Sequence, residues 1–185
     1  MSFLRADLLE RRRIAVTSSV GAELTQSLAA LGAELELLSI DQLPPEEERV
    51  GEWARGRRPL HALVHSAAAA FGAGGEPGLL AALGEAWTAV REVAVGALIE
   101  SGEPAKLVLL APPRAAGPFA GAACDGLENL VRTLSVEWAR YALTAVLVAP
   151  GAGAQPADIA ALVAFLVSEA GEYLSGCRLE LGGAS

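Results

Sequence analysis

The sequence is poor in the side chains that most often move protons in enzymes. Its 185 residues include one lysine, Lys106, and two histidines, His61 and His65. Tyrosine is equally scarce and occurs only as Tyr141 and Tyr173. A general acid–base mechanism therefore has to use one of these few groups or a carboxylate.

Cysteine is also rare, and long hydrophobic runs are missing. Cys124 and Cys177 lack the spacing of a metal site or a disulfide framework, so we expect both to pack as small apolar residues. The formal net charge of −8 argues against nucleic acid as a partner. The apolar runs are too short and too often interrupted to span a bilayer, so no membrane association is expected. The first residues lack the order of a signal peptide, which predicts a cytoplasmic protein.

Short apolar segments alternate with longer amphipathic ones along the chain. Residues 1–12 are expected to be a lead-in and residues 13–185 a single domain. The expected strands are 13–17, 35–40, 61–65, 107–110, 145–149 and 176–181. The expected helices are 20–31, 49–57, 79–100, 121–141 and 156–168, with a flexible connection at 66–75. This alternation predicts an α/β, Rossmann-like, doubly wound parallel sheet in one three-layer domain.

Two of these helices carry clear apolar faces. The helix at 79–100 has apolar residues along one side, namely Leu79, Leu83, Trp87, Val90, Val93 and Ala97. The long helix at 121–141 leads directly into an unbroken apolar strand, Ala145–Ala149, which Pro150 and Gly151 end.

The helix at 121–141, the strand after it and the closing segment LSGCRLELGG resemble the short-chain dehydrogenase/reductase family. In that family a Tyr-x-x-x-Lys helix leads into a strand ending in Pro-Gly, and the last strand ends in Gly-Gly. The resemblance covers the chain from about Arg13 to Gly183. It implies a Rossmann-like sheet, an NAD(P) cofactor and oxidoreductase activity. It also implies that the long helix at 121–141, the helix at 156–168 and the last strand make subunit contacts.

The residues that carry catalysis in that family are missing from this sequence. Aligning the leucines of the long helix places the family tyrosine at Ala120 and the family lysine at Cys124. The family serine position falls on Ala111 or Pro112, and the helix at 79–100 contains no asparagine. No catalytic residue is predicted, because a proton relay cannot be built without its donors.

The glycine-rich turn that holds the cofactor in that family is reduced to the segment Thr17-Ser18-Ser19-Val20-Gly21. A dinucleotide needs glycines at such a turn because backbone amides must approach its pyrophosphate closely. Ser18 or Ser19 is expected to cap the helix that follows. If a cofactor binds, Thr17, Ser18, Ser19 and Gly21 are the residues expected to contact it.

Three more residues are candidates for cofactor contact. Asp41 lies two residues beyond the family's ribose-selecting position, although an acid among turn residues is more often solvated. His65 and Ser66 begin the segment that replaces the family's Asn-Asn-Ala-Gly turn. His65 would then serve as an acid, and the alternative is that both histidines are structural. His61 and His65 are about 13 Å apart along a strand, too far for one metal, so no metal site is expected.

The elements that make subunit contacts in the family are better preserved than its catalytic and cofactor positions. The leading hypothesis is therefore a catalytically inactive subunit, structural or regulatory, that pairs with itself or with an active homologue and needs no cofactor. Candidate interface residues are Leu127, Leu130, Leu134, Trp138, Phe165 and Cys177, with ordinary core packing as the alternative for each. The alternative functions are an atypical NAD(P)-dependent oxidoreductase and a nucleotide-binding module without turnover.

Overall fold

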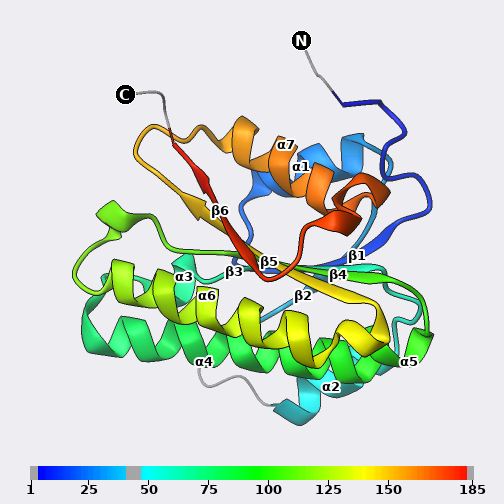
Figure 1. Ribbon diagram of the computed structural model, residues 1–185, viewed down its shortest axis with the longest axis horizontal. Helices are drawn as coiled ribbons and strands as arrows, with labels where there is room; N and C mark the ends of the chain where they lie inside the picture. The colour runs from blue at the N-terminus through cyan, green and yellow to red at the C-terminus, as the bar shows by residue number, and fades with distance from the viewer. Residues whose placement is uncertain (1–3, 41–46, 183–185) are drawn as a thin grey trace.

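The computed structural model describes residues 4–40 and 47–182. Within them, parallel strands form one sheet in the order β2-β1-β3-β4-β5-β6 (Figure 1). The strands are β1 Arg13–Thr17, β2 Glu34–Leu38, β3 Ala62–Ser66, β4 Ala105–Leu110, β5 Leu143–Pro150 and β6 Cys177–Leu181. Every neighbouring pair is parallel, as the sequence predicts.

Helices cover both faces of this sheet. They are α1 Ala22–Ala30, α2 Glu47–Arg55, α3 Ala68–Phe71, α4 Gly75–Val93, α5 Ile99–Ser101, α6 Ala120–Glu137 and α7 Pro156–Val167. Helices α1 and α7 lie on one face, and α2, α4 and α6 lie on the other (Figure 1). Alternate strand residues enter the two cores, with Ile14 and Val16 on the α1 side and Ala15 on the α4 side. The predicted three-layer, Rossmann-like fold is confirmed. No described helix is long and apolar enough to cross a lipid bilayer.

The strand order positions a ligand site. The chain leaves β1 toward β2 and then returns past β1 to β3, so the connections diverge between β1 and β3. Ligands of open parallel sheets bind at such a divergence, beyond the carboxyl ends of the strands. In the common dinucleotide-binding order 3-2-1-4-5-6, a further strand flanks strand 2. In the described part of this chain β2 pairs only with β1, so the outer edge of β2 is open.

The segment between β3 and α4 differs from its prediction. The flexible connection expected at 66–75 contains helix α3, Ala68–Phe71. Phe71 is buried at the end of α3, and this anchors the turn against α4. Gly78 of α4 allows the close contact, because a Cβ at this position would lie 2.3 Å from the carbonyl oxygen of Phe71. The connection is therefore a packed helical turn.

The helix expected at 79–100 is longer than predicted, and Val90, Val93 and Ala97 of its predicted apolar side are buried. It begins at Gly75, runs as α4 to Val93, and continues through a π-helical turn at Ala94–Leu98 into α5. Small residues, among them Ala82 and Ala86, face the sheet. Trp87, which the sequence places on the same side, is 41% exposed. Alanines allow α4 to lie close to the sheet, which leaves the larger tryptophan outside.

Candidate functional site at the carboxyl edge of the sheet

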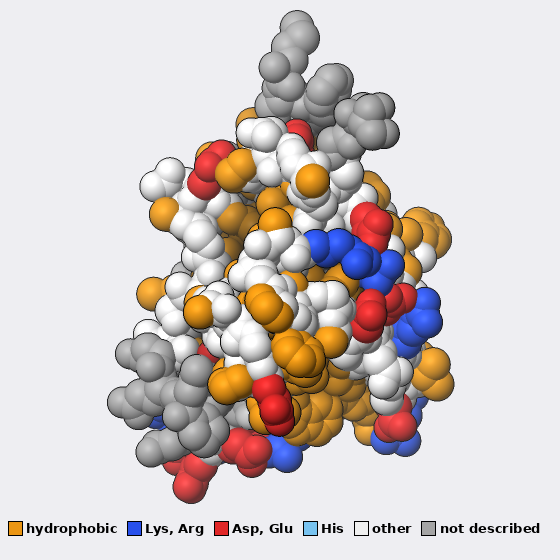
Figure 2. All heavy atoms as spheres, turned by 90° about the vertical axis from the view of Figure 1, so that its left-hand side faces the viewer, with side chains coloured by type: hydrophobic (Ala, Val, Ile, Leu, Met, Phe, Trp, Pro, Cys, Tyr) orange, Lys and Arg blue, Asp and Glu red, His pale blue; other side chains and the backbone are white. Residues whose placement is uncertain are grey.

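A cavity of about 350 Å³ lies where the strand order predicts a ligand site. Figure 2 views the molecule from this edge. The cavity is lined by Gly21, Glu23, Leu24, Ser66, Ala68, Leu110, Ala111, Pro113, Pro150, Gly151, Ala154, Pro156 and Ile159. Glu23 is the one residue of this lining whose side chain ionises, and Ser66 supplies a hydroxyl group. The cavity is otherwise apolar, so it offers little acid–base chemistry.

The turn from β1 to α1 forms one wall of this cavity and is tight. The amide of Val20 donates to the carbonyl of Thr17 over 2.9 Å, which closes the turn directly after the strand. Gly21 is the N-cap of α1, with φ −62° and ψ 151°, and no side chain caps the helix. The predicted cap by Ser18 or Ser19 is therefore wrong. The hydroxyl of Ser18 instead accepts from the amide of Ile40 over 3.1 Å, because the turn brings it beside the end of β2.

The amino end of α1 carries a negative charge of its own. Glu23 lies in the first turn of the helix and is exposed, so its carboxylate already occupies the positive end of the helix dipole. A bound pyrophosphate would add like charge beside that carboxylate. Gly21 is the only glycine of the turn Thr17–Gly21, so few amides are free of side chains for close approach.

A chain of polar side chains runs from this turn into the core. The hydroxyl oxygens of Thr17 and Ser19 are 2.7 Å apart. Thr17 Oγ1 lies 3.2 Å from Nδ1 of His65, which is on the adjacent strand β3. His65 Nε2 lies 4.0 Å from Oε1 of Glu85 on α4, and neither atom has a hydrogen-bond partner in the described residues. Thr17, His65 and Glu85 are all buried, so this chain is enclosed by the protein.

Burial shifts the protonation of this chain's two titratable groups in opposite directions. It lowers the pKa of His65 to about 4, because the imidazolium would lose its hydration. It raises the pKa of Glu85 to about 7, because the carboxylate would lose its hydration. In mildly acidic solution both groups are therefore neutral, with the proton on the Glu85 carboxyl.

The chain was compared with known proteins, and solved structures share its architecture. No protein-family model and no curated protein matches the sequence. A citronellol catabolism dehydrogenase (AtuB) from Pseudomonas aeruginosa PAO1 superposes with a TM-score of 0.76 at 22% identity, over 97% of each chain. A protein from Escherichia coli CFT073, described as a short chain dehydrogenase, gives 0.75 at 17% identity over 96% of this chain and 98% of that one. The fold is that of the short-chain dehydrogenases.

A third match carries a cofactor. A protein from Beutenbergia cavernae, described as an NAD(P)-dependent gluconate 5-dehydrogenase and holding NADP at low occupancy, gives a TM-score of 0.75. Its identity to this chain is 20%, over 95% of this chain and 97% of that one. Since one fold supports many functions, the chemistry of this chain has to be argued from its own residues.

Ala120 and Cys124, where the sequence alignment predicts the family tyrosine and lysine, lie in the first turns of helix α6. Ala120 and Cys124 are each 1% exposed and pack in the core on the α4 side. Burial raises the pKa of the Cys124 thiol, which keeps it protonated. Ala111, one of two candidates for the family serine position, lines the cavity with a methyl group. None of these side chains moves a proton at neutral pH.

The tyrosines and the lysine lie at the other edge of this short-chain dehydrogenase fold. Lys106 is the second residue of β4 and is buried, which lowers the pKa of its ammonium group. Tyr141 ends the 3-10 turn that precedes β5. Tyr173 ends the 3-10 segment before β6 and is 93% exposed. All three mark the beginnings of strands, whereas the cavity lies beyond the strand ends.

The predicted cofactor contacts separate into groups. Gly21 and Ser66 line the cavity. Thr17 and His65 belong to the buried polar chain, and Ser19 stands at its outer end. Ser18 bonds to Ile40, as described above, and Asp41 lies outside the described residues. His61 accepts from the amide of Arg13 through Nδ1 over 3.0 Å, which gives it a structural partner. In the parts of the chain that the structure describes, no cluster of acids, histidines and cysteines could hold a metal ion.

The predicted interface residues do not gather on one surface. Leu127 and Leu134 are 0% and 4% exposed and belong to the core on the α4 side. Leu130 and Trp138 are partly exposed and pack against the same core. Phe165 and Cys177 are also partly exposed, but they pack against the core on the opposite face of the sheet.

Two features escaped the sequence analysis. Glu85 is 3% exposed, although it is an ionisable residue between Gly84 and Ala86 and gave no sign of facing inward. The second feature is a stripe along α4 and its π-helical extension, in which Leu80, Gly84, Trp87 and Val95 are exposed and Arg91 is partly exposed. The spacing of these residues by three or four positions was present in the sequence. It was overlooked because the apolar side through Leu79 and Leu83 fits the same helix.

Proposed function

We propose that this chain is a catalytically inactive subunit with a short-chain dehydrogenase fold, structural or regulatory in role, that pairs through the outer face of α4. The observation that carries this proposal is the separation of Lys106, Tyr141 and Tyr173 from the cavity at the carboxyl edge. A hydride-transfer enzyme of this fold needs a proton donor beside its substrate.

The groups that remain near the cavity are poor replacements. His65 is fully enclosed, with its ring between Thr17 and Glu85, so it does not reach a substrate. Glu23 is exposed and stands where a phosphate would bind, so its charge opposes the cofactor. Ser66 has a hydroxyl group but no base in the cavity lining apart from Glu23. This favours loss of the chemistry over its transfer to other residues.

The outer face of α4 offers a surface for pairing. Leu80, Trp87 and Val95 are 63%, 41% and 53% exposed and follow one another along the same side of the helix. With a rise of about 1.5 Å per residue, they span about 22 Å. Arg91 lies in the same row, but its charge is paired with Glu47 and Glu92. The row is therefore apolar with a neutralised centre.

A glycine in this row supports a partner at close range. Gly84 is exposed in the middle of α4, and a Cβ placed there would meet nothing within 4 Å. Glycine in a helix interior costs about 1 kcal/mol relative to alanine, and no contact with the described residues explains it. A helix that approaches Gly84 from outside would use the missing side chain to come close.

We assign the partner as a second copy of the same chain. A twofold axis near Gly84 would place Leu80 of one copy against the row that includes Trp87 of the other, so the surface complements itself. Figure 2 shows hydrophobic side chains gathered at the end of the molecule where α4 and α6 begin. An active homologue that presents a similar face is the alternative partner.

The experiment that tests pairing is sedimentation velocity of the purified chain. We expect a species of twice the 18.9 kDa chain mass, and monomer after Trp87→Glu, since a charge there would be buried against the partner. Tyr173→Glu is the matched control, because Tyr173 is 93% exposed and lies away from α4. A wild-type monomer, or a Trp87→Glu dimer, would refute self-pairing.

A separate experiment tests the loss of chemistry. Saturating NADH and NADPH are expected to leave the melting temperature unchanged. A cofactor present at a hundredfold excess over its Kd would instead stabilise the fold by about 2.7 kcal/mol. A clear rise with either cofactor would favour the atypical oxidoreductase or the nucleotide-binding module, and consumption of the cofactor with a substrate would distinguish these two.

A further inference from the structure

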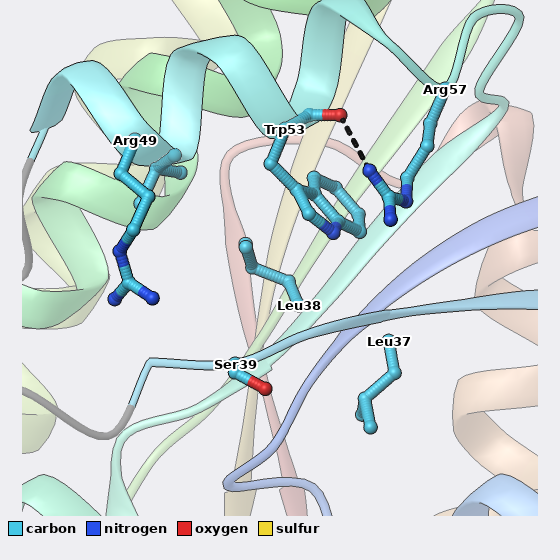
Figure 3. A pocket seen from close by; sticks show the side chains of 7 residues that line it. Leu37, Leu38, Ser39, Arg49, Trp53 and Arg57 are labelled. Atoms are coloured by element: carbon cyan, nitrogen blue, oxygen red, sulfur yellow. Dashed lines mark hydrogen bonds between the residues drawn. The ribbon is translucent and has the colours of Figure 1, made fainter.

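A second cavity lies between the end of β2 and helix α2, away from the carboxyl-edge cavity. It measures about 270 Å³. Leu38, Val50 and Trp53 form its apolar walls, while Ser39, Arg49 and Arg57 supply its polar groups (Figure 3). Because no described strand flanks β2, this cavity lies at an open edge of the sheet.

Arg49 is the unusual member of this lining. Its Nε and Nη2 atoms are buried, yet neither has a hydrogen-bond partner in the described residues. Figure 3 shows the side chain extending from α2 toward Ser39 at the end of β2. An unsatisfied buried donor costs about 1–3 kcal/mol, and a charged one costs more. The arrangement is therefore costly unless something else accepts from these nitrogens.

Glu48 and Glu52 flank Arg49 on α2, but both are exposed and neither makes an ion pair with it. Other acids near this cavity are engaged with other arginines. Glu36 pairs with Arg13 and Arg57. Glu47 and Glu92 both pair with Arg91. These contacts leave the guanidinium of Arg49 as an uncompensated positive charge among the described groups.

The two free nitrogens define the shape of the missing acceptor. Nε–H and Nη2–H lie on the same side of the planar guanidinium and donate in parallel, which matches two oxygens of one carboxylate or phosphate. We propose that this cavity binds a small oxyanion with an apolar body, held by a two-point hydrogen bond to Arg49. The proposal does not depend on the inactive-subunit function, because this cavity shares no lining residue with the cavity that Gly21 and Ser66 line.

The remaining groups suit such a ligand. Arg57 is held in place by Glu36 and by the carbonyl of Trp53, and its guanidinium stacks 4.6 Å from the centre of the Trp53 ring. It therefore adds positive potential, while Arg49 supplies free donors. A cavity of about 150 Å³ is large enough for benzene, so this one has room for a ring and an anionic group.

Isothermal titration with benzoate, phenyl phosphate and inorganic phosphate tests the proposal. We expect both aromatic probes to bind more tightly than inorganic phosphate, since only they fill the apolar part. Tighter binding of phenyl phosphate would identify a phosphate ester as the ligand class, and tighter binding of benzoate would identify a carboxylate. Failure of all three to bind would overturn the proposal.

Variants separate the geometry of Arg49 from its charge. Arg49→Gln should weaken binding by about 10- to 100-fold, because a two-point charged hydrogen bond is lost. Arg49→Lys keeps the charge but not the parallel donors, so it should also weaken binding about tenfold. Arg55→Gln removes the same charge from an exposed position of the same helix and should bind like wild type. Equal affinity of wild type and Arg49→Gln would refute the site.

A third readout needs no variant. The chain has three tryptophans, Trp53, Trp87 and Trp138, and only Trp53 lines this cavity. In an ¹H–¹⁵N spectrum, the probes should shift the indole signal of Trp53 and leave the other two in place. Shifts at Trp87 or Trp138 with none at Trp53 would place the ligand elsewhere and contradict the proposal.

Discussion

The buried pair of His65 and Glu85 predicts an unusual dependence of stability on pH. Glu85→Gln and His65→Gln each remove one titrating group and retain a polar side chain of similar size. In the wild type, between pH 4.5 and 6.5, the folded pair holds one proton, on Glu85. The unfolded chain also holds one proton, on the imidazole, because the ordinary pKa values are 6.5 for histidine and 4.5 for glutamate. Because the folded and unfolded states hold the same number of protons, the free energy of unfolding has almost no slope with pH from this pair.

Each variant exposes one contribution, and the two have opposite signs. In Glu85→Gln only His65 titrates, and its pKa of about 4 in the folded state lies below its unfolded value of 6.5. The unfolded state then binds more protons, so the free energy of unfolding rises with pH over this window. In His65→Gln only Glu85 titrates, and its pKa of about 7 lies above its unfolded value of 4.5. The free energy of unfolding then falls as pH rises through 7.

The expected size of the pH dependence follows from the differences between the folded and unfolded pKa values. A difference of one in pKa is worth about 1.4 kcal/mol, so each variant should show a slope of up to about 1.4 kcal/mol per pH unit. Over the full window each contribution amounts to at most about 3 kcal/mol.

Urea unfolding followed by circular dichroism, at several pH values between 4.5 and 6.5, measures this slope. The informative quantity is the slope of each variant relative to wild type, because other groups contribute equally to all. Glu23→Gln is the control, since Glu23 is exposed and should leave the slope unchanged. Parallel profiles for wild type and both buried variants would refute the reasoning and show that the pair is ionised or hydrated in the fold.

Two pairs of substitutions test the packing. Gly78→Ala should destabilise the fold by about 1–3 kcal/mol in urea unfolding, since its Cβ would lie 2.3 Å from the Phe71 carbonyl oxygen. Gly84→Ala on the same helix should raise the free energy of unfolding of the monomer by up to about 1 kcal/mol, because nothing lies within 4 Å of its Cβ. Destabilisation by Gly84→Ala would contradict the structure. Leu127→Ala should lower the unfolding free energy by about 2–5 kcal/mol because Leu127 is 0% exposed. Val136→Ala, at a position 79% exposed, should change it by less than about 0.5 kcal/mol, and similar losses for both would refute the assigned burial.

Much of the fold could be predicted because central strands such as β4 and β5 are apolar on both sides. Segments such as Ala145–Ala149 have no polar face, so only a sheet covered by helices on both faces accommodates them. Pro156 occupies the first turn of α7 as predicted, because the missing amide of proline costs nothing there. These features depend on local sequence, which is why they were visible.

The features that were missed depend on contacts between distant segments. The glycines near residues 72–75 suggested a flexible connection. The contact of buried Phe71 with α4 instead holds this segment as helix α3. Glu85 faces inward because α4 lies close to the sheet. It thereby comes close to His65, which is 20 positions away in the sequence. The unpartnered nitrogens of Arg49 likewise follow from where the neighbouring acids pair, which no spacing in the sequence reveals.

The two open edges of the sheet bear on how this protein avoids uncontrolled assembly. At one edge β2 carries Glu34 and Glu36, both paired with Arg13. At the other edge β6 carries Arg178, which pairs with Glu128 of α6 and with Glu180 of its own strand. Addition of a foreign strand at either edge would require these charges to lose hydration or partners. Charged side chains at both edges thus protect the backbone against fibrous aggregation.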